Sequence, residues 1–142
     1  MVAELEYSEN TSFAELKRAD HLFWVTLKYT RTVDVIKNII SRLLHSIELA
    51  INELFDKKKM KASPVTGIEK LKLLEQKIQL KEIKELSYYY YYLRELDKSK
   101  YSVKEEYRKG VAMVTPEEII TIERLKEIFI KVKELVEFVN RY

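Results

Sequence analysis

The two histidines are the side chains of this sequence best suited to acid–base or metal chemistry. Neither His21 nor His45 belongs to a Glu-x-x-His or His-x-x-x-His spacing, which would place two metal ligands on one face of a helix. The sequence contains no glycine-rich phosphate loop, no Gly-x-Ser-x-Gly nucleophile turn and no cysteine. We therefore expect no metal site and no cofactor, and we favour a role without catalysis.

A polar stripe along the helix expected from Thr32 to Asp56 is the first candidate site. It contains no lysine although the chain is rich in lysine, so it differs from a freely solvated helix face. We favour a buried network or a subunit contact over a ligand-binding or catalytic surface, because buried polar groups are usually paired. Arg42 and His45, three residues apart, are the pair best suited to function. The stripe comprises Arg31, Asp34, Asn38, Ser41, Arg42, His45 and Asn52.

Five consecutive tyrosines, Tyr88 to Tyr92, form the second candidate surface. Successive helical residues are about 100° apart, so five in a row cannot all face a core. We expect Tyr89 and Tyr90 to point inward, which leaves Tyr88 and Tyr91 exposed near two basic residues. Such a face suits packing or self-association, and it also suits stacking of RNA bases beside phosphate contacts. The candidate aromatic and basic face comprises Tyr88, Tyr91, Arg94 and Lys98.

The composition indicates one folded domain over residues 1–142, built from long elements. Only two glycines and two prolines interrupt the chain, and 46% of its residues are hydrophobic. A net charge of +3 is too small to indicate nucleic acid by itself. No apolar run reaches membrane-spanning length and the first ten residues do not resemble a signal peptide, so we expect a cytoplasmic protein.

Apolar periodicity predicts an all-α, up-and-down bundle of about five helices, two of them long. Ser12 and Glu15 form a capping-box pattern at the first helix. The apolar face then rotates, which favours a break between Tyr29 and Thr32, although one helix over residues 13–56 stays an alternative. A loop is expected from Ala62 to Gly67. Further helices are expected from Ile68 and over Lys81 to Asp97, and one continuous helix stays an alternative.

Two further capping patterns predict the helices of the C-terminal third. Ser102 with Glu105 predicts a short helix that Gly110 closes. Thr115, followed by proline and glutamate, predicts the start of the last helix. Its apolar stripe indicates pairing with the second helix along most of its length. Residues 111–114, between these two patterns, suit either an extended connector or a small strand.

The segment Tyr29-Thr-Arg-Thr-Val-Asp-Val-Ile36, its helix to Phe55 and a C-terminal helix after Thr115 resemble small archaeal members of the HEPN superfamily. The resemblance covers most of the chain and rests on helix order and length. It implies a helical bundle that dimerises, and in many members a ribonuclease or toxin whose partner is a minimal nucleotidyltransferase. Separately, lysine, glutamate and isoleucine are abundant and glutamine is scarce, a composition common in proteins from hot environments.

The active motif of that superfamily, an arginine followed four to six residues later by histidine, is absent. Arg18–His21 and Arg42–His45 have two intervening residues each, and no histidine follows His45. We therefore expect a non-catalytic interaction or binding module that forms a homodimer. The alternative is an HEPN-like RNA-binding protein or ribonuclease, in a toxin–antitoxin pair, with His45 as acid or base.

Overall fold

The computed structural model of the protein describes residues 11–58 and 66–142, which form five helical rods and a small antiparallel sheet. The expected all-α class is therefore wrong in its strict form, although the fold is mostly helical. The helical segments are α2 (Ser12–His21), η1 (Leu22–Thr26), α3 (Leu27–Tyr29), α4 (Val33–Lys57), α5 (Gly67–Lys77), α6 (Lys81–Lys98) and α7 (Ile122–Arg141). The strands are β1 (Ser102–Lys104), β2 (Ala112–Val114) and β3 (Ile119–Thr121).

The first rod is continuous through α2, η1 and α3, and it contains one π-helical turn at η1. The buried residues Leu16, Ala19, Phe23 and Leu27 of the rod keep a spacing of three or four across this turn, so the apolar face rotates only at the break that follows. Phe23 is turned inward and its ring stacks on Phe129 at 6.0 Å, while Trp24 is half exposed. The predicted break after Tyr29 is confirmed, because Thr32 caps α4 by accepting a hydrogen bond from the Val35 amide.

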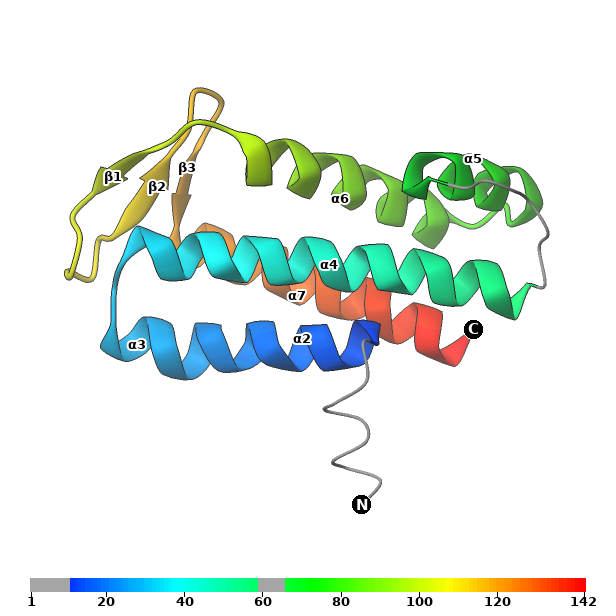
Figure 1. Ribbon diagram of the computed structural model, residues 1–142, viewed down its shortest axis with the longest axis horizontal. Helices are drawn as coiled ribbons and strands as arrows, with labels where there is room; N and C mark the ends of the chain where they lie inside the picture. The colour runs from blue at the N-terminus through cyan, green and yellow to red at the C-terminus, as the bar shows by residue number, and fades with distance from the viewer. Residues whose placement is uncertain (1–10, 59–65) are drawn as a thin grey trace, which may run out of the picture.

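Helix α4 is the centre of the bundle and packs against α2, α5, α6 and α7 (Figure 1). Its predicted pairing with the last helix is confirmed. At the C-terminal end of α4, Lys57 donates to the carbonyl oxygens of Val139 and Asn140, at 2.6 and 3.1 Å. These carbonyls belong to the last turn of α7, where the helix dipole favours a cation. Most of the core residues of α4 have no exposed surface: Ile36, Ile39, Ile40, Leu43, Ile47, Ala50, Ile51 and Leu54.

Helices α5 and α6 are separate elements, joined by a short extended segment at Ile78. The predicted loop before α5 lies mainly outside the described residues. Gly67, the first residue of α5, sits against Tyr90 of α6, and a Cβ atom there would lie 2.8 Å from the Tyr90 hydroxyl. Glycine at this position allows α5 to approach α6 closely.

Two of the predicted helix starts are wrong, because one segment forms a strand and the other forms a turn. Residues 102–104 pair with β2, so Ser102 and Glu105 do not open a helix. The Thr115 hydroxyl accepts from the Glu118 amide at 3.0 Å, which is a helix-cap contact used here in the turn between β2 and β3. Helix α7 begins seven residues later, and its actual cap is Thr121, which accepts from the Arg124 amide.

The sheet lies at the end of the bundle where α6 ends and α4 begins (Figure 1). Its strand order is β1-β2-β3, and β2 pairs antiparallel with both neighbours. Met113 and Ile120 are fully buried and join the sheet to the helical core. Among the described residues, no helix is long and apolar enough to cross a membrane.

Candidate functional site

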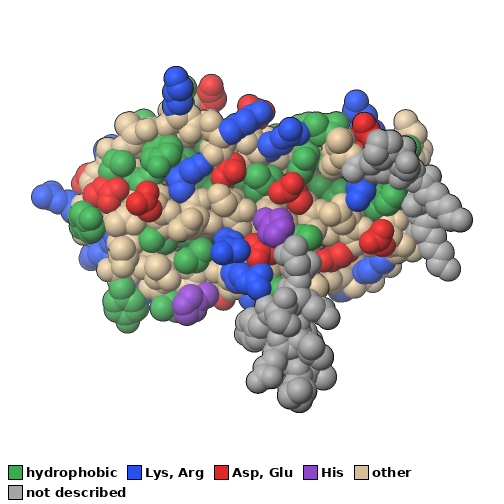
Figure 2. Space-filling model, in the orientation of Figure 1, with side chains coloured by type: hydrophobic (Ala, Val, Ile, Leu, Met, Phe, Trp, Pro, Cys, Tyr) green, Lys and Arg blue, Asp and Glu red, His purple; other side chains and the backbone are tan. Residues whose placement is uncertain are grey.

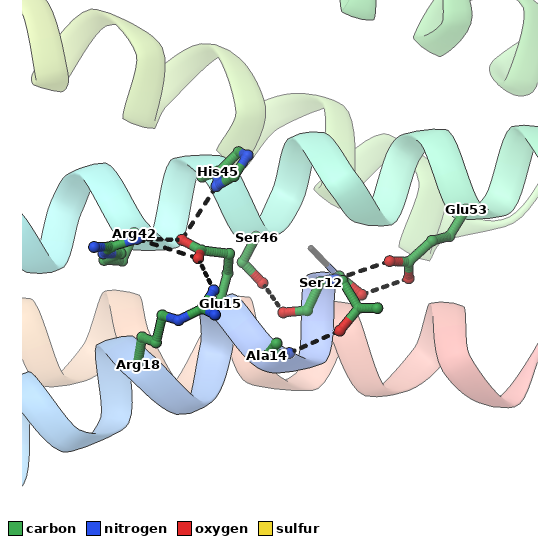
Figure 3. A network of polar contacts seen from close by, with 9 residues as sticks. Ser12, Ala14, Glu15, Arg18, Arg42, His45, Ser46 and Glu53 are labelled. Carbon is green, nitrogen blue, oxygen red and sulfur yellow. Dashed lines mark hydrogen bonds and ion pairs between the residues drawn. The ribbon is translucent and has the colours of Figure 1, made fainter. Parts of the chain in front are cut away.

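A buried carboxylate, Glu15 on α2, is the centre of the candidate site (Figure 3). Only 1% of its surface is exposed, and three cationic or ionisable side chains converge on it. Arg42 Nη1 lies 3.2 Å from both carboxylate oxygens, and His45 Nδ1 lies 3.1 Å from Oε2. Arg18, one turn along α2, donates to Oε1. Glu15 is therefore an ion-pair partner of α4 and not the capping residue that the sequence predicted.

The start of α2 is held against α4 by a second set of polar contacts, which places Glu15 (Figure 3). Thr11 is the N-cap, and its hydroxyl accepts from the Ala14 amide at 3.1 Å. Glu53 of α4 accepts from the Ser12 amide at 2.8 Å and from the Ser12 hydroxyl at 2.5 Å. The Ser46 hydroxyl donates to the Ser12 carbonyl at 2.7 Å. These contacts fix the register between the two helices.

The pKa of Glu15 shows which influence dominates at this site. Burial raises the pKa of the carboxyl, but hydrogen bonds from His45, Arg18 and Arg42 lower it by more, so the net shift is downward from 4.5. Glu15 is therefore ionised at neutral pH. A buried carboxylate of this kind holds its arginines in place through charge-assisted hydrogen bonds.

An open groove of about 620 Å³ lies beside this network and has Arg18 and Arg42 in its wall. Trp24, half exposed, forms its aromatic part, and the Lys126 ammonium lies 5.5 Å from the centre of the Trp24 ring system. Figure 2 shows the two histidines of the sequence on one face of the molecule, with Lys and Arg side chains between them. The residues lining the groove are Lys17, Arg18, Asp20, His21, Leu22, Trp24, Val25 and Arg42.

The groove combines positioned guanidinium groups with an exposed aromatic surface. Arg42 uses Nη1 for both contacts with Glu15, and its side chain is 47% exposed, so its fork of donors also faces solvent. Guanidinium groups recognise phosphate and carboxylate oxygens, and an indole ring stacks on flat ligands. Among residues 11–58 and 66–142, no cluster of three His, Asp or Glu side chains is placed to hold a metal ion.

The structure brings together only part of the predicted polar stripe. Arg42 and His45 both contact Glu15. Asp34 and Asn38 lie nearer the start of α4 and are exposed. Arg31 lies in the turn before α4, where its carbonyl accepts from the Tyr107 amide. Two stripe residues bind elsewhere: Ser41 donates to Asp97 at 2.6 Å, and Asn52 accepts from Lys70 at 2.7 Å.

Sequence reasoning missed Glu15 and Trp24 as site residues. A signal for Glu15 existed, since Arg18 follows it at the i,i+3 spacing of a helical ion pair. The capping-box interpretation instead assigned the Glu15 carboxylate to the backbone amides at the start of the first helix. Trp24 carried no signal, because it lies outside the apolar face that Leu16, Phe23 and Leu27 share and no motif marks it as a binding residue.

The tyrosine run behaves as expected at its exposed positions. Tyr88 and Tyr91 are 60% and 41% exposed, whereas Tyr90 is buried and Tyr89 is half-buried. Tyr88 stacks on Tyr92 with ring centres 6.1 Å apart, while Tyr91 meets Tyr90 edge-on at 5.6 Å. The two exposed tyrosines thus belong to two different ring clusters. Of the predicted basic residues, Arg94 lies over Tyr90 and Lys98 pairs with Glu95.

Tyr92 is the polar end of the first ring cluster and connects α6 to α7. Its hydroxyl donates to Glu118 and accepts from Arg124 at 3.2 Å. Burial raises the pKa of Tyr92, the Glu118 carboxylate raises it further, and Arg124 opposes both influences without reversing them. The pairing is compact and internally satisfied, which indicates a structural role.

Known proteins give no independent guide to this site. No protein-family model, no curated protein and no solved structure matches the chain.

Proposed function

We propose that this protein is a non-catalytic binding module whose groove beside α2 and α4 binds single-stranded RNA through its phosphates. The observation that supports this most is the convergence of Arg18, Arg42 and His45 on one buried carboxylate at the wall of the groove. Arg42 meets Glu15 through Nη1 alone and its side chain is 47% exposed, so its guanidinium also faces the groove, where an anionic ligand can meet it. Because Glu15 already orders the arginines, binding loses little side-chain entropy.

The exposed ring of Trp24 favours RNA over a simple inorganic anion as the ligand of the groove. Its exposed ring lines the same groove as Arg42, so a base could stack while a neighbouring phosphate meets the guanidinium. Stacking of one base on an aromatic side chain contributes about 1–3 kcal/mol in single-strand binders. The modest total charge of +3 is then no obstacle, because a short contact needs only a local cluster of cations.

A titration of mixed-sequence, fluorescein-labelled single-stranded RNA tests the proposal. We expect binding that weakens as salt rises from low to moderate, and a loss of about tenfold for Arg42→Ala at low salt. Lys84→Ala on α6, which removes an exposed cation away from the groove, is the matched control and should bind as the wild type does. Equal affinity of both variants would contradict the role of the groove.

Self-association is the second part of the proposal and comes from the HEPN resemblance. The exposed Tyr88 and Tyr91 suit a contact between copies, since exposed tyrosines are frequent at interfaces. Light scattering should then give the mass of a dimer for the wild type and a lower mass for Tyr88→Glu or Tyr91→Glu. A monomeric wild type would contradict the proposed dimer, but it would not bear on RNA binding in the groove.

A ribonuclease is the second candidate, and the position of His45 favours it. A histidine whose Nδ1 is held by a buried carboxylate has its other ring nitrogen oriented for proton transfer. In this case purified protein should shorten the labelled RNA, and His45→Ala should abolish cleavage while the circular dichroism spectrum is unchanged. Intact RNA after long incubation with the wild-type protein would contradict the ribonuclease and support the non-catalytic module. A minimal nucleotidyltransferase is the protein partner that the resemblance implies for either activity.

A further inference from the structure

The outer edge of β1 is a second surface, remote in sequence from the groove residues. Among residues 11–58 and 66–142, β1 lies at one edge of the sheet and pairs with β2 alone. All three of its residues are exposed. An edge strand presents unpaired N–H and C=O groups, which can receive another extended chain.

The register of the sheet shows which side of β1 is apolar. Val103 is opposite Met113, and Met113 is opposite Ile120, so the three side chains share one face of the sheet. Met113 and Ile120 are fully buried, whereas Val103 is 51% exposed, because no further strand of the described residues lies beyond β1. A residue added opposite Val103 would extend this apolar row and should itself be apolar.

The exposed charges around β1 are mainly basic, although Glu105, also exposed, follows Lys104 directly. Ser102 and Lys104 project to the opposite face from Val103, since side chains alternate along a strand. Lys100 and Lys104 are exposed, and Arg108 and Lys109 are exposed on the loop that follows. An added strand would meet these cations with the residues that flank its apolar one, so acidic residues fit there. Lysine at an edge also repels ordinary apolar strands, which makes the edge selective.

The loop after β1 is fastened to the helical bundle, so the edge is presented on a rigid support. The Tyr107 amide donates to the Arg31 carbonyl at 2.6 Å, and Glu106 accepts from the Val33 amide at 3.2 Å. Glu105 and Tyr107 adopt left-handed backbone conformations, with φ of 49° and 67°. Each costs about 1–2 kcal/mol for a residue other than glycine, a cost typical of positions with a function.

We propose that the outer edge of β1 binds an extended peptide segment of a partner protein in which acidic and apolar residues alternate, adding it as a fourth strand. Backbone hydrogen bonds supply affinity, and the alternation of Val103 with Ser102 and Lys104 supplies specificity. RNA fits the cations but cannot satisfy the N–H and C=O groups of a strand edge in a regular ladder. The observations therefore favour a peptide, independently of the RNA-binding groove.

The probe is a fluorescein-labelled peptide, Ser-Glu-Val-Glu-Val-Glu-Ser, titrated with the full-length protein and followed by fluorescence anisotropy. We expect saturable binding, and none of a peptide in which lysine replaces every glutamate. Lys100→Glu with Lys104→Glu should weaken binding by about tenfold, and the matched control Lys81→Glu with Lys84→Glu on α6 should not.

Amide hydrogen exchange distinguishes strand addition from a loose charge contact. Bound peptide should slow exchange within Ser102–Lys104 and leave the α4 amides unchanged. Val103→Pro, which removes an amide donor, should abolish peptide binding. Because that variant could disturb the sheet, Val103→Ser tests the apolar contact separately and should weaken binding with the circular dichroism spectrum intact. No binding of the acidic peptide, or binding without protection of β1, would overturn the proposal, as would displacement by RNA at equal concentration.

Discussion

Glu15 illustrates, at the scale of single residues, how one buried charge organises a surface. Its carboxylate ties Arg42 and His45 of α4 to Arg18 of α2. The side chains of Arg18 and Arg42 are 35% and 47% exposed, whereas the carboxylate beneath them is almost fully buried. The buried part of the site is therefore the Glu15 carboxylate, and the part proposed to meet a ligand is the guanidinium groups.

Glu15→Gln should lower the free energy of unfolding by about 1–2 kcal/mol at neutral pH, because the amide accepts fewer charge-assisted hydrogen bonds. The folded-state pKa of Glu15 is below 4.5, so its contribution is present above about pH 4.5 and is lost as pH falls through the folded pKa. Urea unfolding at several pH values checks this. The gap between wild type and variant should narrow in acid, and a gap that stays constant would contradict the ionised pair.

Tyr92→Phe removes the hydroxyl that links Glu118 and Arg124, and it should cost about 1 kcal/mol at neutral pH. The pKa of Tyr92 is raised in the folded protein, so its stabilisation is present below pH 10 and is lost as pH rises further. The variant should therefore approach the wild type in stability at high pH. Thermal unfolding between pH 8 and 11 measures this, with Tyr88→Phe, on an exposed ring, as the control.

At the scale of elements, α2 depends on α4 for more than apolar packing. Glu53 accepts two hydrogen bonds from Ser12 across the interface, and one of them satisfies the Ser12 amide, which has no partner within α2. Glu53→Ala should cost about 1 kcal/mol and speed amide exchange in the first turn of α2. Glu48→Ala, an exposed glutamate of the same helix, is the control and should change neither quantity. Unchanged exchange in α2 would show that Glu53 has no capping role.

The helices were predictable because apolar spacing marks them directly, as for α4 and α6, where the expected ranges agree with the structure within a residue or two. The sheet was not, because Ser102–Glu105 and Thr115–Glu118 carry the same local pattern as a helix cap. Only pairing with residues 112–114 makes them strand and turn, and that pairing is non-local. In the site, the stripe predicted Arg42 and His45, but their partner Glu15 lies on another helix.

At the scale of the whole molecule, the groove and the β1 edge are separate surfaces on one helical support. Each should respond to its own variants, because no residue of one belongs to the other. Arg42→Ala should weaken RNA binding and leave peptide binding at β1 unchanged, and Lys100→Glu with Lys104→Glu should do the reverse. Parallel titrations of both ligands with both variants check this. Loss of both activities in either variant would indicate one shared surface.

The fluorescence of Trp24 offers the most direct test of the central claim, since it is the only tryptophan of the chain and lines the groove. Titration with unlabelled single-stranded RNA should quench or shift its emission, with a midpoint that rises with salt and rises about tenfold in Arg42→Ala. RNA that binds with unchanged Trp24 emission, or RNA that does not bind even at low salt, would contradict a role of the groove in RNA binding.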